Sequence, residues 1–438
     1  MITDARAVRP YTLAQTTFNS LLMKFAIIII GDEILLGQVT DTNSGEIARA
    51  LAPLGWQTGE IVTVADDADA IREAVERALA RYPLVITTGG LGPTKDDITK
   101  HTLMGVFGGE LVFDPSVLEN VEEIFAKRGL KINELTRTQA MVPTSCRVIQ
   151  NRYGTAPVMW FETADREHVL VSMPGVPFET AGMLRHGVTD EIARRFHPDI
   201  TILHTTFLIT GITESALAER LAEVESALDP TLHLAYLPTP GLIRLRVDGK
   251  DSDAGRIARL HAEACEAVEH TVGELIISRH DATPEQLLLD ALRSRGLKLA
   301  TAESCTGGNI AHRITLIAGA SDVFNGSVVS YANEVKTGVL GVDPADIEQY
   351  GAVSESVVRQ MAEGAAARLG ADCAVATSGI AGPGGGSADK PVGTVWIAAH
   401  TPKGTVARLL HCPGNRARVI DRASTEALLL LLKSLQNV

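Results

Sequence analysis

The residues best suited to chemistry lie late in the chain, in Thr301-Ala-Glu-Ser-Cys-Thr-Gly-Gly308. This stretch joins hydroxyl, carboxylate and thiol side chains to a glycine pair, and a helical pattern over 309–317 follows it. A loop that opens a helix directs free backbone N–H groups outward, which suits an anion or a polarised carbonyl. Ser304 and Cys305 are therefore candidate nucleophiles. The alternative is an ordinary capped loop of small residues, and this stretch alone leaves both readings open.

Two glycine-rich loops near the N-terminus predict a phosphate site. They are Gly31-Asp-Glu-Ile-Leu-Leu-Gly37 and Gly89-Gly-Leu-Gly-Pro-Thr-Lys-Asp-Asp97, and each follows an apolar run. Glycines let a backbone wrap around phosphate oxygens, and a helix start adds a favourable dipole. The spacing matches neither a Walker loop nor a dinucleotide-binding fingerprint, so we expect only a nucleotide or phosphate site. The residues expected there are Gly31, Asp32, Glu33, Gly90, Gly92 and Thr94.

Carboxylates beside these loops predict a divalent metal ion of unknown identity. Asp32, Asp96 and Asp97 are the expected ligands, because carboxylates next to a phosphate loop commonly hold such a cation. The alternative for Asp96 and Asp97 is that they are ordinary acidic residues in the first turn of the helix over 98–107.

A third glycine-rich segment, Ser378-Gly-Ile-Ala-Gly-Pro-Gly-Gly-Gly386, follows an apolar strand-like run in the last part of the chain. Its backbone N–H groups form a natural cradle for an anion, although a flexible surface loop has the same composition. Taken alone, Ser321 and Lys336 are ordinary surface residues.

The elements that must position these residues alternate between strand and helix patterns. In the first domain the continuous apolar run Phe25–Ile30 is typical of a strand buried on both faces. Such alternation predicts a doubly wound parallel sheet, with ligands at the carboxyl ends of its strands. The expected strands are 25–31, 59–64 and 84–88, and the expected helices are 41–54, 67–82 and 98–107.

The middle of the chain predicts a small α+β module, with a strand over 200–210, a helix over 213–228, a hairpin around Pro238–Gly241 and a helix over 254–272. It carries neither a Gly-x-x-Gly clamp nor a basic stripe, so we expect no nucleic-acid partner. The last domain begins at Thr283-Pro-Glu-Gln286, a helix cap followed by proline. The expected division is an extension 1–22, an N-terminal domain 23–198, a connecting module 199–280 and a C-terminal domain 281–438.

Composition limits the function classes. The 438 residues are 45% hydrophobic and carry a net charge of −13, which disfavours non-specific binding to nucleic acid or an anionic membrane. Five widely spaced cysteines suit neither a disulfide framework nor a zinc site. No run reaches the roughly 20 apolar residues of a membrane span. The cysteines are typical of reduced, cytoplasmic thiols, so we expect a cytoplasmic protein. Either Met23 is the true start or residues 1–22 are a loose extension.

The N-terminal loops resemble the molybdopterin-binding-like domain of the CinA family, as do Gly154-Thr-Ala-Pro157 and Met173-Pro-Gly-Val-Pro-Phe-Glu179. The resemblance implies metal-dependent ADP-ribose pyrophosphatase activity. Two positions depart from the family pattern: Cys146 stands where Pro-x-Gly-Ala usually ends, and Val158 replaces a usual glycine. The middle part, through Gly211-Ile-Thr-Glu-Ser215, resembles the family's KH-like connecting domain.

The last domain resembles the family's C-terminal domain through Ala302–Gly308, Tyr331-Ala-Asn-Glu-Val-Lys336 and Ser378–Gly385. The resemblance implies hydrolysis of nicotinamide mononucleotide to nicotinic acid mononucleotide and ammonia, in NAD recycling. It places a serine nucleophile at Ser321 and its base at Lys336, with Tyr331 assisting and no cofactor. Expected substrate contacts are Ser304, Thr306, Gly307, Ser378, Gly379 and Arg418.

Two alternatives stay open. The N-terminal domain could bind nucleotide without turnover, or the whole chain could be a competence-associated nucleotide-binding protein. Expected partners are nicotinamide mononucleotide and ADP-ribose, and we expect a homodimer with no membrane partner.

Overall fold

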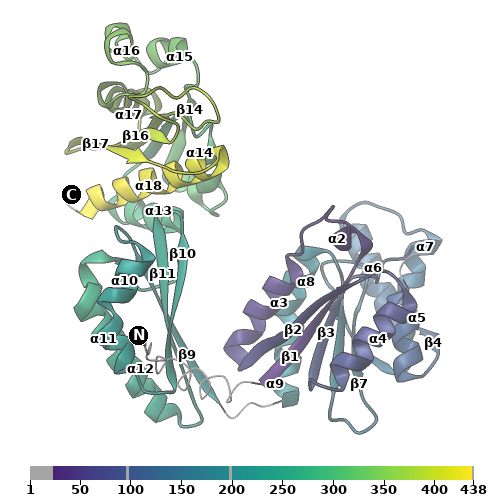
Figure 1. The fold of residues 1–438 in the computed structure, drawn as a ribbon. Coiled ribbons are helices and arrows are strands. Elements are labelled where there is room, and N and C mark those ends of the chain that lie inside the picture. Colours follow the sequence, from purple (N-terminus) through teal and green to yellow (C-terminus); the bar gives the residue numbers. More distant parts are fainter. Residues whose placement is uncertain (1–22, 95–97, 197–199, 437–438) are drawn as a thin grey trace, which may run out of the picture. The chain divides into compact units, whose positions relative to one another are not determined.

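The computed structural model describes residues 23–94, 98–196 and 200–436, and Figure 1 shows the helices and strands that they form. The predicted extension 1–22 and the predicted metal ligands Asp96 and Asp97 lie outside the described residues.

The N-terminal domain is built on a six-stranded sheet in the order β2-β1-β3-β8-β7-β6. Strands β2, β1, β3 and β8 are parallel, as predicted, whereas β7 runs antiparallel to both of its neighbours. The sheet is therefore mixed, and its antiparallel edge was not predicted. Its elements are β1 (Met23–Ile30), α2 (Asp32–Leu35), α3 (Asn43–Leu51), β2 (Trp56–Val64), α4 (Ala68–Leu79), β3 (Leu84–Thr88), α5 (Thr99–Phe107), β4 (Leu111–Phe113), α6 (Pro115–Lys127), α7 (Glu134–Arg137), β5 (Met141–Pro143), β6 (Cys146–Ile149), β7 (Val158–Glu162), β8 (Val169–Met173), α8 (Pro177–Met183) and α9 (Thr189–Phe196).

Strand β1 shows why its sequence is apolar without interruption. Phe25, Ile27 and Ile29 enter a core that includes residues of α3 and α8. Ala26, Ile28 and Ile30 enter a second core with residues of α4 and α5. Successive side chains of a strand point to opposite faces, so a strand covered on both faces must be apolar at every position. The α/β class predicted for this domain is confirmed.

The middle module has a four-stranded sheet in the order β10-β11-β9-β12. The helix predicted over 213–228 is interrupted at Leu221, which separates α10 from α11. Its elements are β9 (Thr201–Ile209), α10 (Glu214–Arg220), α11 (Ala222–Ser226), β10 (Leu232–Thr239), β11 (Leu242–Asp251), α12 (Ala254–Val272) and β12 (Ile276–Ser278).

The C-terminal domain has a five-stranded sheet in the order β14-β13-β15-β16-β17. Strands β14, β13 and β15 are parallel, and β16 and β17 continue the sheet antiparallel. One face packs on α13, α14 and α18, and the other on α17 (Figure 1). The elements are α13 (Pro284–Arg295), β13 (Leu299–Glu303), α14 (Asn309–Thr315), β14 (Phe324–Val329), α15 (Asn333–Gly338), α16 (Pro344–Tyr350), α17 (Glu355–Leu369), β15 (Cys373–Gly379), β16 (Thr394–Thr401), β17 (Gly404–His411) and α18 (Arg416–Gln436).

A membrane-spanning segment was not expected, and no helix among the described residues has the length and hydrophobicity to cross a bilayer. All five cysteines are free.

Candidate functional sites

The loop that opens the C-terminal site is organised by Glu303, the last residue of β13. Its carboxylate is fully buried and accepts the backbone N–H groups of Gly308, Ile310 and Ala311 at 2.8–3.0 Å. These groups are the unsatisfied donors at the start of α14, where a carboxylate is also favoured by the helix dipole. The prediction that they face outward toward a ligand is therefore wrong, because an internal side chain occupies them.

The loop presents Ser304 and hides its neighbours. Cys305 is only 5% exposed, and burial raises the pKa of its thiol to about 12, so it is a thiol and a poor nucleophile near neutral pH. Thr306 is also buried, and its hydroxyl donates to Glu303 Oε2 at 2.7 Å and lies 2.7 Å from Thr377 Oγ1. Ser304 is partly exposed, and its backbone N–H donates to the Thr377 carbonyl.

Lys336 lies at the same end of the sheet as Ser304. In the parallel pairing of β13 with β14, Glu303 stands opposite Val329, and the next residue, Ser330, donates its N–H to the Glu303 carbonyl at 2.8 Å. Lys336 Nζ in turn donates to the Ser330 carbonyl at 2.7 Å and to the Tyr331 carbonyl at 3.3 Å. The amine thus sits directly beyond the carboxyl ends of the two strands.

Burial changes the chemistry of that amine. Lys336 is 1% exposed, and desolvation lowers the pKa of its amino group, although the nearby Cys305 and Glu334 oppose the shift. A neutral lysine amine has two N–H bonds and one lone pair. In that form both N–H bonds would have carbonyl acceptors here, and the lone pair would be available to take a proton.

The structure does not bring Ser321 to Lys336. Ser321 is exposed and precedes β14, where Val323 accepts the N–H of Leu299 at the start of β13. Lys336 lies beyond the other end of the same strand. Six strand residues at about 3.3 Å each separate the two ends by roughly 20 Å. Strand β14 thus separates the predicted nucleophile, Ser321, from the predicted base, Lys336, because the two residues lie beyond opposite ends of this strand.

Arg416, which was not predicted as a site residue, contacts Tyr331, the third predicted catalytic residue. Arg416, the first residue of α18, donates to the Tyr331 hydroxyl at 3.0 Å and to the Gly382 carbonyl at 2.8 Å. It therefore links the tyrosine to the glycine-rich segment. The predicted Arg418 lies two positions further along the helix, and residues with that spacing face different directions.

The remaining predicted substrate contacts, Ser378, Gly379 and Gly307, differ in their exposure and in the space around them. Ser378 is buried, and its hydroxyl donates to the Ala352 carbonyl at 2.6 Å, so its side chain holds the loop. Gly379 has no room for a side chain, because a Cβ would lie 2.8 Å from the Thr394 carbonyl oxygen. Gly307 is exposed with φ of +62°, the left-handed conformation that favours glycine.

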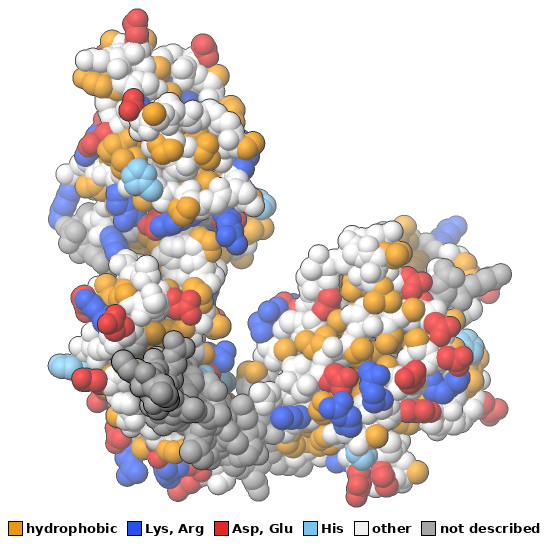
Figure 2. All heavy atoms as spheres, viewed as in Figure 1, with side chains coloured by type: hydrophobic (Ala, Val, Ile, Leu, Met, Phe, Trp, Pro, Cys, Tyr) orange, Lys and Arg blue, Asp and Glu red, His pale blue; other side chains and the backbone are white. Residues whose placement is uncertain are grey.

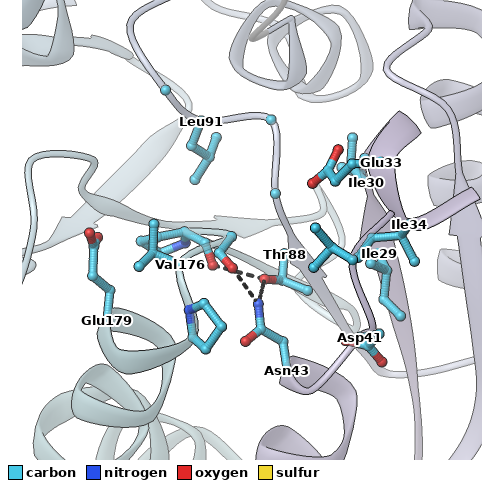
Figure 3. Close-up of a pocket in the computed structure, with 18 of the residues that line it drawn as sticks. Ile29, Ile30, Glu33, Ile34, Asp41, Asn43, Thr88, Leu91, Val176 and Glu179 are labelled. Carbon is cyan, nitrogen blue, oxygen red and sulfur yellow. Dashed lines mark hydrogen bonds between the residues drawn. The ribbon is translucent and has the colours of Figure 1, made fainter. Parts of the chain in front are cut away.

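The N-terminal loops line a cavity of about 550 Å³ at the carboxyl ends of β1, β3 and β8 (Figure 3). Gly31, Glu33, Gly90 and Gly92 lie in its wall, as predicted for a shared site. Asp32 and Thr94 are exposed and are not among the lining residues. Residues that the sequence did not single out include Asn43, which donates to Thr88 and to the Gly175 carbonyl, as well as Asp41, Asp66, Thr155 and Glu179.

The charge of this cavity is one-sided. Its described lining includes Glu33, Asp41, Asp66 and Glu179 but neither Lys nor Arg. An anionic ligand would meet these carboxylates without a positive side chain from the described wall. A divalent cation bound with the ligand would offset that repulsion.

Of the three predicted metal ligands, Asp32 lies in the described part of the chain. Asp32 and Asp66 form reciprocal hydrogen bonds from backbone to side chain: the Asp32 N–H donates to the Asp66 carboxylate, and the Asp66 N–H donates to the Asp32 carboxylate. The two carboxylates therefore lie in adjoining loops and are suitable donors for a hard cation. The one three-residue cluster found in the described parts of the chain, Asp165, Glu167 and His168, precedes β8 and lies at the opposite end of the sheet.

The two departures from the family pattern lie outside the cavity wall. Val158 is fully buried in β7, and Cys146 begins β6, where it pairs with Phe161. Neither lines the cavity, whereas Thr155 and Ala156 of the neighbouring motif do. Neither departure is therefore among the residues that line the described cavity.

The two sites and their folds define a multidomain α/β protein, and comparison with known proteins gives its family. Residues 26–194 match the probable molybdopterin binding domain, 204–278 the damage-inducible protein CinA KH domain, and 281–435 the CinA C-terminal domain. A CinA-like protein of Cytophaga hutchinsonii is 41% identical over 412 residues, covering 94% of this chain and 98% of that protein. The chain belongs to the CinA family.

Two further known proteins are similar to this chain. A putative competence-damage inducible protein of Caldicellulosiruptor saccharolyticus is 36% identical, covering 95% of this chain and all of that protein. A crystal structure of a CinA superfamily protein from Klebsiella pneumoniae is 34% identical to this chain, with a TM-score of 0.35, and covers 36% of this chain and all of its own.

Proposed function

We propose that the C-terminal domain hydrolyses the carboxamide of nicotinamide mononucleotide to nicotinic acid mononucleotide and ammonia. One observation carries the proposal: the partly exposed Ser304 and the buried Lys336 lie beyond the carboxyl ends of the neighbouring strands β13 and β14. Amide hydrolysis needs a nucleophile and a base of this kind. The nucleotide substrate itself is suggested by the family resemblance.

Within this proposal Ser304 replaces Ser321 as the nucleophile. Neutral Lys336 takes the Ser304 proton as the hydroxyl oxygen attacks the carboxamide carbon. The protonated lysine then returns the proton to the departing nitrogen, which leaves as ammonia. Water hydrolyses the resulting ester, with Lys336 again as base, and restores the serine and the free acid.

Tyr331 and Arg416 lie beside this site, because the Tyr331 carbonyl accepts a hydrogen bond from Lys336 and the Tyr331 hydroxyl accepts one from Arg416. Tyr331 is 62% exposed, and its hydroxyl is held by the guanidinium of Arg416. An exposed aromatic ring offers a stacking surface for a pyridine, and the guanidinium offers charge to a phosphate. We assign substrate orientation to this pair.

The test is ammonia release from nicotinamide mononucleotide by the full chain with a chelator present. We expect activity in the wild type and in Ser321→Ala, and loss of at least about a hundredfold in Ser304→Ala. The opposite pattern would restore Ser321. No ammonia from the wild type would favour a nucleotide-binding protein without turnover.

A second activity, metal-dependent hydrolysis of ADP-ribose, is proposed for the N-terminal cavity. The observation that favours it is a glycine-rich cavity with four acidic and no basic residues in its described wall, which a diphosphate would enter with a cation. Asp32 would hold that ion together with Asp96 and Asp97. AMP release that needs a divalent metal and disappears in Asp97→Ala would support it. Binding of ADP-ribose without AMP release would show a binding domain.

Both proposed activities place the protein in pyridine-nucleotide recycling. We also propose a cytoplasmic homodimer, and light scattering of the full chain gives the mass that tests the dimer.

A further inference from the structure

Glu179 is the carboxylate of the N-terminal cavity that is best built to meet a ligand. It lies in the first turn of α8, at the end of the Met173–Glu179 motif, and lines the cavity (Figure 3). Burial raises the pKa of its carboxyl above the ordinary value, although Asn151 and the charge of Arg128 act in the other direction. A carboxylate placed at such a desolvation cost is a candidate for function.

The side chain is held by a rigid anchor. Asn151 is fully buried, and its amide donates to Glu179 Oε2 at 2.7 Å and to the Ala156 carbonyl at 2.9 Å. The side-chain oxygen of Asn151, Oδ1, accepts the N–H groups of Tyr153 and Gly154. Gly154 has no space for a side chain, since a Cβ would lie about 2 Å from the Glu179 carboxylate. One carboxylate oxygen is thus fixed, and the group is oriented before any ligand binds.

The other carboxylates of the wall are differently engaged. Asp41 accepts both the N–H and the hydroxyl of Ser44 as a helix-capping group, and Asp66 accepts the N–H of Asp32. Glu33 is exposed and folds back over Gly31. Glu179 alone among these four combines partial burial with a fixed position on a buried amide.

We propose that Glu179 accepts a hydrogen bond from a ribosyl hydroxyl of a nucleotide in this cavity. The inference rests on the proposed nucleotide function of the N-terminal domain. A carboxylate that is not bridged by a cation repels phosphate and favours a neutral hydrogen-bond donor beside it, and sugar hydroxyls are such donors. Carboxylates meet ribose hydroxyls in the same way in dinucleotide-binding folds. The phosphates then lie toward the glycines of the Gly89–Pro93 loop, which carries no carboxylate.

The experiment compares ligands with and without a sugar. Dissociation constants of ADP-ribose and inorganic pyrophosphate are measured by calorimetry on the full chain with Ca²⁺, which takes oxygen ligands as Mg²⁺ does, and AMP is assayed after each titration to show that ADP-ribose stays intact. In Glu179→Gln the amide oxygen keeps the bond from Asn151, but an N–H₂ group replaces the free acceptor. We expect ADP-ribose binding to weaken roughly tenfold or more, as for loss of a bond to a charged group, with pyrophosphate binding unchanged.

Glu122→Gln, an exposed residue of α6, is the matched control for the change in charge, and both affinities should stay at the wild-type value. Equal weakening of both ligands in Glu179→Gln would overturn the ribose assignment, because the residue would then act through the metal or the phosphates. Unchanged binding of both would overturn it as well while leaving the nucleotide function intact. A wild type that binds neither ligand would overturn the nucleotide function and the assignment together.

Discussion

Replacing Lys336 tests whether a buried amine is the base. Lys336→Met keeps the length and the apolar stem but removes the amine, and Lys336→Arg keeps a cation that does not lose its proton near neutral pH. A general base contributes about 10²- to 10⁴-fold, so we expect kcat to fall by at least about a hundredfold in both variants. If Lys336 acted only as a positive charge and not as a base, the arginine variant would keep its activity.

The structure also gives the effect on stability. The methionine variant loses two hydrogen bonds, to the carbonyls of Ser330 and Tyr331, each worth about 1 kcal/mol. It also no longer buries a polar amine, a change that acts in the opposite direction. The free energy of unfolding should therefore change by no more than about 2 kcal/mol, and chemical denaturation at pH 7 measures it.

The pH dependence follows from the lowered pKa of Lys336. Between the folded-state value and the ordinary lysine value, the unfolded chain binds one more proton than the folded chain, so wild-type stability rises with pH across that window. Lys336→Met lacks this rise. The activity should increase with pH as the amine becomes neutral, with a midpoint below the ordinary lysine pKa. Full activity in the arginine variant, or an identical pH dependence of stability in wild type and methionine variant, would refute the reasoning.

Three further changes test the surrounding loop. Glu303→Gln should lower stability by about 1–3 kcal/mol in denaturation, because an amide cannot accept all the N–H groups that the carboxylate does; unchanged stability would contradict its capping role. Cys305→Ala should keep most of the amidase activity, and thiol reagents should react slowly with Cys305 in the folded wild type; an inactive variant would reopen the thiol as nucleophile. Arg416→Ala should raise KM for nicotinamide mononucleotide roughly tenfold or more, and Arg418→Ala should not; the reverse ranking would restore the predicted arginine.

The sequence was a good guide to elements and a poor guide to which residues meet. Uninterrupted apolar runs such as Phe25–Ile30 predicted doubly covered strands, and Thr283 with its proline predicted the start of α13 to the residue. The antiparallel β6–β7 edge was missed, because pairing direction depends on contacts between distant segments. The interruption at Leu221 was missed as well, since helical periodicity continues across it.

Site geometry depended on tertiary structure that no local pattern encodes. In the sequence, Lys336 has the pattern of an ordinary surface lysine. In the structure it is buried, and its amine contacts the Ser330 carbonyl in the turn after β14. Ser321 is close to Lys336 in sequence, but strand β14 lies between them, so the two residues are at opposite ends of the sheet. Glu303 caps a helix from inside the sheet, so no capping motif marks it.

The most direct test of the central claim is to find which serine becomes esterified. The full chain is quenched with acid during turnover of nicotinamide mononucleotide, digested with trypsin and studied by mass spectrometry. Cleavage after Lys298, Arg313 and Lys336 separates a peptide 299–313, which holds Ser304, from a peptide 314–336, which holds Ser321. We predict the acyl nucleotide on Ser304 of the first peptide. An adduct on Ser321 of the second would contradict the account.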